Sequence, residues 1–402
     1  MNPSLRLTGK QYTALCERLR AKEPLWLICG RRDRAGAPIL TARRFASSPT
    51  EPGLVCGTGD MLQHAGAAGW LRLHDDGALS GGLFQQEPVA FSRIAVAGDE
   101  LLFWGTEDSR RYHHPAHARN VQAFGEGTIR RLGGLSVAII GCSGVGFPTA
   151  QALAGQGAGR FVLVDPETIE DVNLNRLPCA TRDDAGKLKV ECLAALLGNS
   201  AFRPEVVPLA SSILTDRRAA LEVAECDVIF GCLDSVEARH FLNRLAAAYN
   251  IPYFDLGVCL RADGKGGISA ACGSVHYVQP DGSSLLSRGV YDMQAVHDEG
   301  LRRTDSVEFA RRLEEKYVRG AAEKRPAVLP LNMAIAAHGV MEFMARLHPF
   351  RTRTSSHFAA QCVSFQHGII DREAEGEPCP SLSALCGCGD IQPFLGLPAF
   401  AA

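Results

Sequence analysis

The chain has 402 residues and lacks the features of a membrane, secreted or nucleic-acid-binding protein. No apolar run approaches the roughly 20 residues of a membrane span, and the N-terminal residues contain no apolar signal-peptide core. Lysine and arginine total 42 against 44 aspartates and glutamates, so a formal net charge of -2 provides no basic field for phosphate backbones. We expect a cytoplasmic protein with neither a membrane nor a nucleic acid as partner.

An evenly spaced cysteine framework is also absent, although the chain has 14 cysteines. In a reducing compartment scattered thiols are mostly buried, with any exceptions catalytic or metal-binding. At roughly 150 residues per domain the length predicts two or three domains, which need no disulfide support. The 41 glycines point to tight turns and phosphate loops.

Two domains are expected, the first over residues 1–108 with an α+β pattern. Short apolar runs alternate there with turn residues, after an opening helix near Gly9 to Ala21. The polar stretch from Asp108 to Ala118 is the predicted linker. Residues 109–402 form the larger domain, with a charged, solvent-facing insertion at about 282–330 and a cysteine-containing C-terminal tail.

The larger domain opens with a βαβ unit. An apolar run from Val137 to Ile140 ends in Gly141, a small-residue helix follows from about Gly144 to Gly155, and Arg160 to Val164 form the next run. Strand, glycine turn, helix and strand predict an α/β fold with a parallel sheet covered by helices on both faces.

The glycine turn has the pattern of a phosphate-binding loop. Gly141, Gly144 and Gly146 fit G-x-x-G-x-G between a strand and a helix, where the backbone can approach a phosphate and helix amides can bind it. The next strand ends in Asp165, whose carboxylate suits ribose hydroxyls. These features allow a dinucleotide or ATP equally, and such a turn can also serve packing alone.

The following residues favour ATP. Asn173 and Arg176 lie just beyond the strand-end aspartate, and Lys187 and Lys189 follow at a predicted helix start. Hydride transfer has no need for cations there, whereas a polyphosphate gains charge in a transition state that such groups stabilise.

Taken in order, these motifs resemble the ThiF/MoeB family and the adenylation domains of ubiquitin-activating enzymes. The family pattern runs G-x-G-G-x-G, a strand-end aspartate, N-L-x-R, G-x-x-K and C-x-D. Ser143 replaces one glycine here, Lys189 rather than Lys187 fills the lysine position, and Cys232 to Asp234 supply the last motif. The resemblance implies a Rossmann-like adenylation domain beside a smaller N-terminal α+β domain.

The resemblance also implies an ATP site. Asp165 would hold the ribose, the amides around Ser143 to Gly146 would bind the α-phosphate, and Asn173 would orient the triphosphate. The implied nucleotide-binding residues are Gly141, Ser143, Gly144, Gly146, Asp165, Asn173, Arg176 and Lys189.

The implied chemistry is formation of an acyl-adenylate. Arg176 and Lys189 would neutralise the triphosphate, and Asp234 would bind Mg²⁺ near the departing pyrophosphate. A substrate carboxylate would attack the α-phosphorus, a step that depends mainly on positioning and charge stabilisation. The next helix carries Arg239 and Asn243 in family register.

Upstream, Arg119 to Gly127 resemble a family motif whose arginine reaches across a homodimer interface to the partner's ATP. Arg119 is therefore the implied finger, and a homodimer is expected. The linker histidines His113, His114 and His117 are more consistent with exposed side chains than with a metal site.

The family pattern fails at its zinc site. Ser284 and Ser287 stand where many relatives have a C-x-x-C pair, and serine is a poor zinc ligand. Cys379 is what is left of the second pair, so structural zinc is expected to be absent.

The C-terminal thiols raise a further question, because the crossover insertion contains no cysteine for a thioester. A reactive thiolate needs exposure and a lowered pKa. Cys386, or alternatively Cys388, lies in a small-residue stretch that could reach the site, although both could be remnants of the zinc site. Cys142 and Cys232 are expected to pack beneath the nucleotide.

Residues 1–108 are faintly similar to JAB/MPN-type domains, which precede ThiF-like modules in some bacterial fusions. The metalloprotease pattern is missing, because His74 stands alone, Arg72 occupies the preceding histidine position and Ser80 lacks its aspartate. The similarity implies a domain that has lost its zinc and binds a protein partner.

The leading hypothesis is an ATP-dependent activating enzyme for the C-terminal carboxylate of a ubiquitin-like or sulfur-carrier protein. It would act in a bacterial conjugation pathway, pass the acyl group to a cysteine and meet a conjugating-enzyme-like protein. A peptide-modifying adenylase is the alternative enzyme, and a non-catalytic scaffold is the alternative from another class. Survival of Arg176, Lys189 and Asp234 counts against the scaffold.

Overall fold

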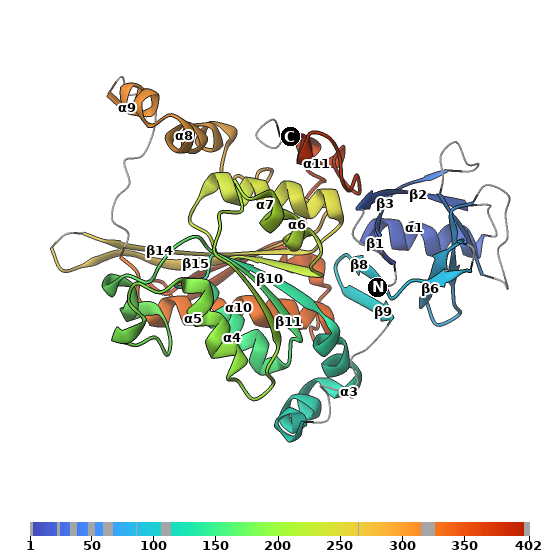
Figure 1. Ribbon diagram of the computed structural model, residues 1–402, viewed down its shortest axis with the longest axis horizontal. Coiled ribbons are helices and arrows are strands. Elements are labelled where there is room, and N and C mark those ends of the chain that lie inside the picture. Colours follow the sequence, from blue (N-terminus) through green and yellow to red (C-terminus); the bar gives the residue numbers. More distant parts are fainter. Residues whose placement is uncertain are drawn as a thin grey trace.

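The computed structural model describes residues 3–21, 25–32, 38–46, 53–58, 67–85, 87–105, 114–263, 265–314 and 326–397. Their strands form two sheets, one from the N-terminal part of the chain and one from the remainder (Figure 1). Within those ranges, no helix is both long and apolar enough to cross a bilayer.

The N-terminal part is a nine-stranded mixed sheet in the order β7-β6-β5-β4-β2-β3-β1-β8-β9. Helix α1 (Gly9–Arg20) packs against it and begins with a capping box between Thr8 and Gln11, which confirms the predicted opening helix. The strands are β1 (Ser4–Thr8), β2 (Leu25–Arg32), β3 (Ile39–Ala46), β4 (Gly53–Gly57), β5 (Gly69–Leu73), β6 (Leu79–Leu83), β7 (Val89–Ala90), β8 (Arg93–Ala97) and β9 (Leu101–Gly105).

The second sheet has eight strands in the order β12-β11-β10-β13-β14-β15-β16-β17. Its first five strands are parallel, and β15 to β17 continue the sheet in antiparallel pairing, so the predicted α/β class is confirmed. The strands are β10 (Ser136–Ile140), β11 (Arg160–Val164), β12 (Glu205–Leu209), β13 (Val228–Gly231), β14 (Tyr253–Ala262), β15 (Ile268–Val278), β16 (Ala360–Ser364) and β17 (Ile369–Glu373).

Helices cover both faces of this sheet, as the βαβ pattern predicts (Figure 1). They are α3 (Ala118–Gly134), α4 (Gly146–Gln156), α5 (Lys189–Gly198), α6 (Arg217–Ala224), α7 (Val236–Tyr249), α8 (Met293–Thr304), α9 (Ser306–Glu314), α10 (Leu329–Leu347) and α11 (Pro380–Ser383). Short 3-10 turns span Pro115–His117, Asp171–Arg176, Arg182–Asp184, Ser355–Phe358 and Phe394–Gly396.

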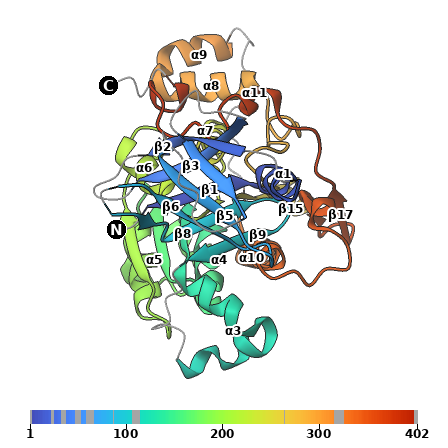
Figure 2. The same cartoon turned by 90° about the vertical axis from the view of Figure 1, so that its right-hand side faces the viewer.

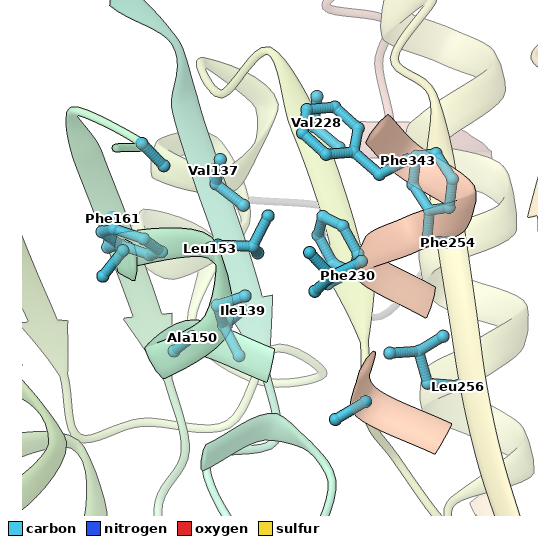
Figure 3. Close-up of a cluster of buried hydrophobic side chains, with 14 of the residues drawn as sticks. Val137, Ile139, Ala150, Leu153, Phe161, Val228, Phe230, Phe254, Leu256 and Phe343 are labelled. Carbon is cyan, nitrogen blue, oxygen red and sulfur yellow. The ribbon is translucent and has the colours of Figure 1, made fainter. Parts of the chain in front are cut away.

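The side chains of β10 point alternately to the two faces of the sheet, and each face has its own hydrophobic layer. Val137 and Ile139 pack with α4, α5 and α10 on one face, whereas Ala138 and Ile140 pack with α6 and α7 on the other. Figure 3 shows the first layer, where the rings of Phe230 on β13 and Phe254 on β14 stack and Phe343 of α10 contacts both in edge-to-face geometry. Parallel strands that are buried on both faces consist of consecutive apolar residues, as Val137 to Ile140 of β10 do.

The two sheets are joined by buried hydrogen bonds. Arg6 of β1 is 4% exposed and donates to the carbonyl oxygens of Ala224, Glu225 and Cys226 at the end of α6, at 2.7–3.0 Å. Asn250, just after α7, donates to the Ala42 carbonyl oxygen at 2.8 Å. The N-terminal sheet is therefore fixed to the helix ends of the larger domain.

The C-terminal segment completes this junction. Its Gly389 pairs with Arg31 of β2 in parallel, and the Gly387 carbonyl oxygen accepts from Thr41 of β3 at 2.9 Å. Figures 1 and 2 show α11 near α7 and the blue N-terminal sheet. The predicted C-terminal tail is thus a packed connector between the two parts.

Two expectations about the connecting segments change. Residues 106–113, which include most of the linker and His113, lie outside the described residues. His114 is exposed as expected, but the prediction that His117 is exposed is wrong, since it is 4% exposed and stacks on Phe202 with ring centroids 4.1 Å apart. An imidazole has an apolar ring face, so an aromatic partner distant in sequence can bury it.

The predicted insertion contains α8 and α9 up to residue 314, and residues 315–325 lie outside the description. Glu299 of α8 accepts hydrogen bonds from Ser235 and from the Glu237 amide at the start of α7. Arg303 forms an ion pair with Glu237 at 2.7 Å. The insertion therefore covers the amino end of α7.

Candidate active site

The glycine turn between β10 and α4 is too crowded for side chains. Gly141 has φ +88, and a Cβ there would lie 2.5 Å from the Cys232 carbonyl oxygen. A Cβ on Gly146 would lie 1.8 Å from the Gly141 carbonyl oxygen. At Gly144 it would lie 2.5 Å from Nδ2 of Asn332, a buried α10 residue that the sequence analysis missed. Gly141 and Gly146 meet backbone atoms, so these two positions require glycine.

The turn leads directly into α4 without a side-chain cap. Val145 is the N-cap residue and makes no side-chain hydrogen bond, and the Ser143 carbonyl oxygen accepts from the Phe147 amide at 2.8 Å. Amides at an uncapped helix start can bind an anion. Cys142 is fully buried in this turn and Cys232 is half-buried opposite it, as expected of packing residues.

Asp165 follows β11 and connects the strand end to the glycine turn. Its Oδ2 accepts from the Cys142 amide at 2.7 Å, and its Oδ1 accepts from the Glu167 amide at 2.9 Å. Burial raises the pKa of Asp165, which backbone donors and Lys189 partly counteract. A carboxylate can accept about four hydrogen bonds, so this one keeps capacity for ribose hydroxyls.

Lys189 lies at the same strand end, at the start of α5. Its side chain is 3% exposed and its ammonium group forms an ion pair with Glu167, whose side chain is 67% exposed. Sequence reasoning missed Glu167, because a glutamate two residues beyond a strand usually faces solvent. The pair gives the buried ammonium group an anionic partner whose carboxylate remains exposed to solvent.

Asn173 and Arg176 occupy the 3-10 turn after Asp165. Asn173 is 5% exposed, and its Oδ1 accepts from the Glu170 amide at 3.2 Å. Arg176 is half-buried and donates to the Val172 carbonyl oxygen at 2.8 Å. The guanidinium thus folds back on its own turn.

Asp234 is exposed at the end of β13, and Ser235 after it caps α7 by accepting from the Ala238 amide at 3.1 Å. The described residues contain no group of three or more metal ligands. One exposed carboxylate still fits Mg²⁺ that arrives with a nucleotide, because this ion keeps several waters and binds phosphate oxygens.

Arg119 does not join the site of its own chain. It is exposed at the start of α3 and donates to Gln122 Oε1 at 2.8 Å. The adjacent Asn120 donates to the carbonyl oxygen of Gly155, at the far end of α4 from the glycine turn. Gly155 is about 14 Å along α4 from Gly146, the residue of the glycine turn that begins this helix, at a rise of 1.5 Å per residue.

Ser284 and Ser287, the two serines at the expected positions of a cysteine pair, form hydrogen bonds with each other. The Ser284 amide donates to Ser287 Oγ at 2.9 Å, and the Ser287 amide donates to Ser284 Oγ at 3.3 Å. Cys379 is 2% exposed in a small apolar cluster with Ala247 and Leu382. This region is held by packing and a reciprocal serine turn.

Cys386 and Cys388 lie at the carboxyl end of α7, away from the glycine turn. The Gly387 amide donates to the Ala247 carbonyl oxygen at 3.0 Å. Ala247 is about 16 Å along α7 from Val236, the first residue of that helix. The Cys386 thiol donates to Asn250 Oδ1 at 3.4 Å, and burial raises its pKa to about 12. This placement does not favour a nucleophile.

The raised pKa of Cys386 predicts slow alkylation. At pH 8 a thiol with a pKa near 12 is about 0.01% thiolate, and the thiolate is the reactive form. We expect iodoacetamide to label the exposed Cys362 and Cys179 at least about tenfold faster than Cys386. Mass spectrometry of proteolytic peptides over a time course measures the three rates. Equal labelling of Cys386 and Cys362 in folded protein would contradict the assigned burial.

A doubly covered α/β sheet with a glycine turn, a strand-end aspartate and a buried lysine defines a nucleotide-binding domain of Rossmann-like class. Residues 117–346 match the model of the ThiF family, which is more than half of the chain. The chain belongs to the ThiF family.

Curated relatives match parts of the chain. An adenylyltransferase and sulfurtransferase UBA4 from Meyerozyma guilliermondii is 29% identical over 161 residues, which is 40% of this chain and 37% of that protein. A ubiquitin-like modifier-activating enzyme 5 from Drosophila mojavensis is 30% identical over 208 residues, 48% of this chain and 49% of that protein. In each case the match spans less than half of the relative.

Among solved structures, E. coli MccB bound to MccA-N7isoASN has a TM-score of 0.52 at 20% identity, covering 69% of this chain and 76% of that one. MccB with ATP has a TM-score of 0.50 at 19% identity, with 69% and 76% covered. At these identities the likeness shows the fold, which agrees with the Rossmann-like class.

Proposed function

We propose that this chain is an ATP-dependent adenylyltransferase that activates the C-terminal carboxylate of a ubiquitin-like or sulfur-carrier protein. The observation that carries the proposal is the buried Lys189, which stands next to Asp165 and the glycine turn and forms an ion pair with the exposed Glu167. A buried cation at a phosphate-binding turn suits a polyphosphate. The names of the curated relatives support the reaction class.

In this proposal the nucleotide uses groups already in place. Asp165 accepts from the ribose hydroxyls, the amides from Ser143 to Gly146 bind the α-phosphate, and Asn173 orients the triphosphate. Lys189 exchanges Glu167 for phosphate oxygens. Asp165 and the turn amides need little reorganisation because the turn is held by backbone contacts.

Arg176 turns from its own 3-10 turn toward the triphosphate, and Asp234 holds Mg²⁺, which supplies positive charge to the pyrophosphate group. The substrate carboxylate oxygen bonds to the α-phosphorus while the bond from that phosphorus to the bridging oxygen breaks, and pyrophosphate leaves. Positioning and charge stabilisation account for most of the rate.

A peptide-modifying adenylase is the second candidate. The specific observation in its favour is the likeness to MccB, solved in complex with N-formylated MccA, over 70% of this chain. The N-terminal sheet, joined firmly to α6 and α7, would then bind the peptide. Under both candidates the reaction at the α-phosphorus is the same.

Finer points rest on the family resemblance. A homodimer would bring Arg119 of one copy to the ATP of the other, and a fully active monomer would refute that role. A cytoplasmic location and a conjugating-enzyme-like partner belong to the same proposal. A JAB/MPN ancestry of the N-terminal domain is compatible with His74, whose ring nitrogen hydrogen-bonds Ser80 Oγ at 2.7 Å.

ATP–pyrophosphate exchange tests the proposed function. We expect exchange to require Mg²⁺ and one class of substrate from a panel of ubiquitin-like proteins, sulfur carriers and short peptides. The same substrate with an amidated C-terminus should give none, because it lacks the attacking oxygen. If no panel member supports exchange while the chain binds ATP, the result supports the scaffold alternative.

A further inference from the structure

A buried polar group on β14, β15 and α7 has no role in the site described so far. Asp255 of β14 is 0% exposed and pairs in register with His276 of β15, so both side chains lie on one sheet face. Arg239 of α7 lies against that face, with its Nε 3.3 Å from Asp255 Oδ1. We call these three residues the Arg239 group.

The Arg239 group contains three polar atoms that are buried and without a hydrogen-bond partner in the described part of the chain. They are Arg239 Nε, Asp255 Oδ2 and His276 Nδ1. Arg239 Nε lies within ion-pair distance of Asp255 Oδ1, so the two remaining atoms are the ones that need an explanation, because leaving a buried polar group unsatisfied costs about 1–3 kcal/mol. A ligand that offers both acceptor and donor groups would satisfy all of them.

Neighbouring residues fix the arginine in place. The Tyr253 hydroxyl donates to Asp255 Oδ1 at 2.8 Å, and a Cβ on Gly231 would lie 2.7 Å from that hydroxyl. A Cβ on Gly257 would lie 2.9 Å from Arg239 Nη2. Two glycines thus leave room for the Tyr253 ring and the guanidinium, and Asp255 anchors both.

The Arg239 group borders the proposed adenylation site. Arg239 lies on the second turn of α7, five residues after Asp234. The carboxylate of Asp255, and to a smaller extent that of Asp234, raises the pKa of Arg239 against the effect of burial. The Arg239 side chain is 17% exposed, whereas its Nε atom is buried.

We propose that the Arg239 group is the subsite for the last residue of the acyl substrate, a chain end with a free carboxylate. Arg239 binds that carboxylate beside Asp234, and the free Asp255 oxygen and His276 nitrogen accept from the last peptide N–H. A peptide terminus offers both groups within one residue. This subsite rests on the proposed function, since it orients the carboxylate that attacks the α-phosphorus.

The test uses three variants of the full chain and one control. Arg239→Lys replaces the guanidinium group with a single ammonium group, and Asp255→Asn removes the negative charge that holds Arg239 in place. Gly257→Ala displaces the flexible end of Arg239, at a backbone position that alanine can adopt. Asp263→Asn is the matched control, because this exposed carboxylate of the β14–β15 turn accepts hydrogen bonds from the Lys265 and Gly267 amides at 2.7 and 2.8 Å.

Steady-state pyrophosphate exchange gives KM for ATP and for the acyl substrate identified by the panel. We expect each of the three variants to raise KM for the acyl substrate at least about tenfold, as for loss of a charge-assisted contact, while KM for ATP changes less than twofold. A fluorescent peptide with the substrate's last ten residues should bind the unmodified chain as the acid and not as the amide.

Two failures are distinguishable. Absence of exchange by the unmodified chain refutes the proposed function and the subsite with it. Exchange with unchanged acyl KM in Arg239→Lys and Gly257→Ala refutes the subsite alone, and the Arg239 group then holds only buried water. A loss of ATP affinity in these variants also refutes it.

Discussion

Replacing Lys189 with alanine should lower the rate of ATP–pyrophosphate exchange by roughly 10²–10³-fold, the usual loss when one preorganised charge is removed from a transition state. The ammonium group is held at the strand end by burial and by Glu167. Alanine leaves Glu167 unpaired, but that side chain is 67% exposed and stays hydrated. The fold should therefore persist, and thermal unfolding checks this.

Lys187→Ala is the matched control for this experiment. Lys187 lies two residues earlier, with a side chain that is 55% exposed and an ion pair to Asp184 at 2.8 Å. Its removal should change the exchange rate less than twofold, because a screened surface pair contributes little. Equal losses for both variants would contradict a specific role for Lys189.

Replacing Arg6 with methionine should lower the free energy of unfolding by about 3 kcal/mol, because carbonyl oxygens that accept from a buried charged donor lose it. Arg6 donates to Ala224, Glu225 and Cys226 across the junction of the two sheets. Methionine fills similar space without a donor. Urea denaturation followed by circular dichroism measures the change.

The control is Arg20→Met at the exposed end of α1, expected to shift stability by less than about 0.5 kcal/mol. Because the C-terminal segment also bridges both sheets, a single cooperative transition is expected in every variant. Two separate transitions, with only the N-terminal one shifted by Arg6→Met, would show that the junction is not part of one cooperative unit.

Local crowding explains why the glycine turn could be located from the sequence. Gly141 and Gly146 are required by contacts within a few residues of chain or with the adjacent strand end, so the requirement is visible as a glycine pattern. Asp165 and Lys189 are placed by the strand and helix that precede or follow them. The parallel sheet was equally visible, because strands buried on both faces need continuous apolar runs.

Contacts between distant segments were not visible in the same way. His117 is buried by Phe202, Cys386 by the end of α7, and Asp255 is brought to Arg239 by a strand pairing. Nothing near these residues in the chain records their partners. The small-residue stretch around Cys386 suggested mobility, whereas glycines there permit close packing on β2 and β3.

The sequence by itself determined the α/β class, the glycine turn and the order of the residues proposed to bind the nucleotide, because short-range sterics and strand periodicity require particular residues at particular spacings. Only the tertiary structure decided which thiols are buried, where Arg119 stands relative to its own site, and that Arg239, Asp255 and His276 meet. Those outcomes depend on which surfaces pack together, and packing energy is summed over contacts between residues far apart in the chain.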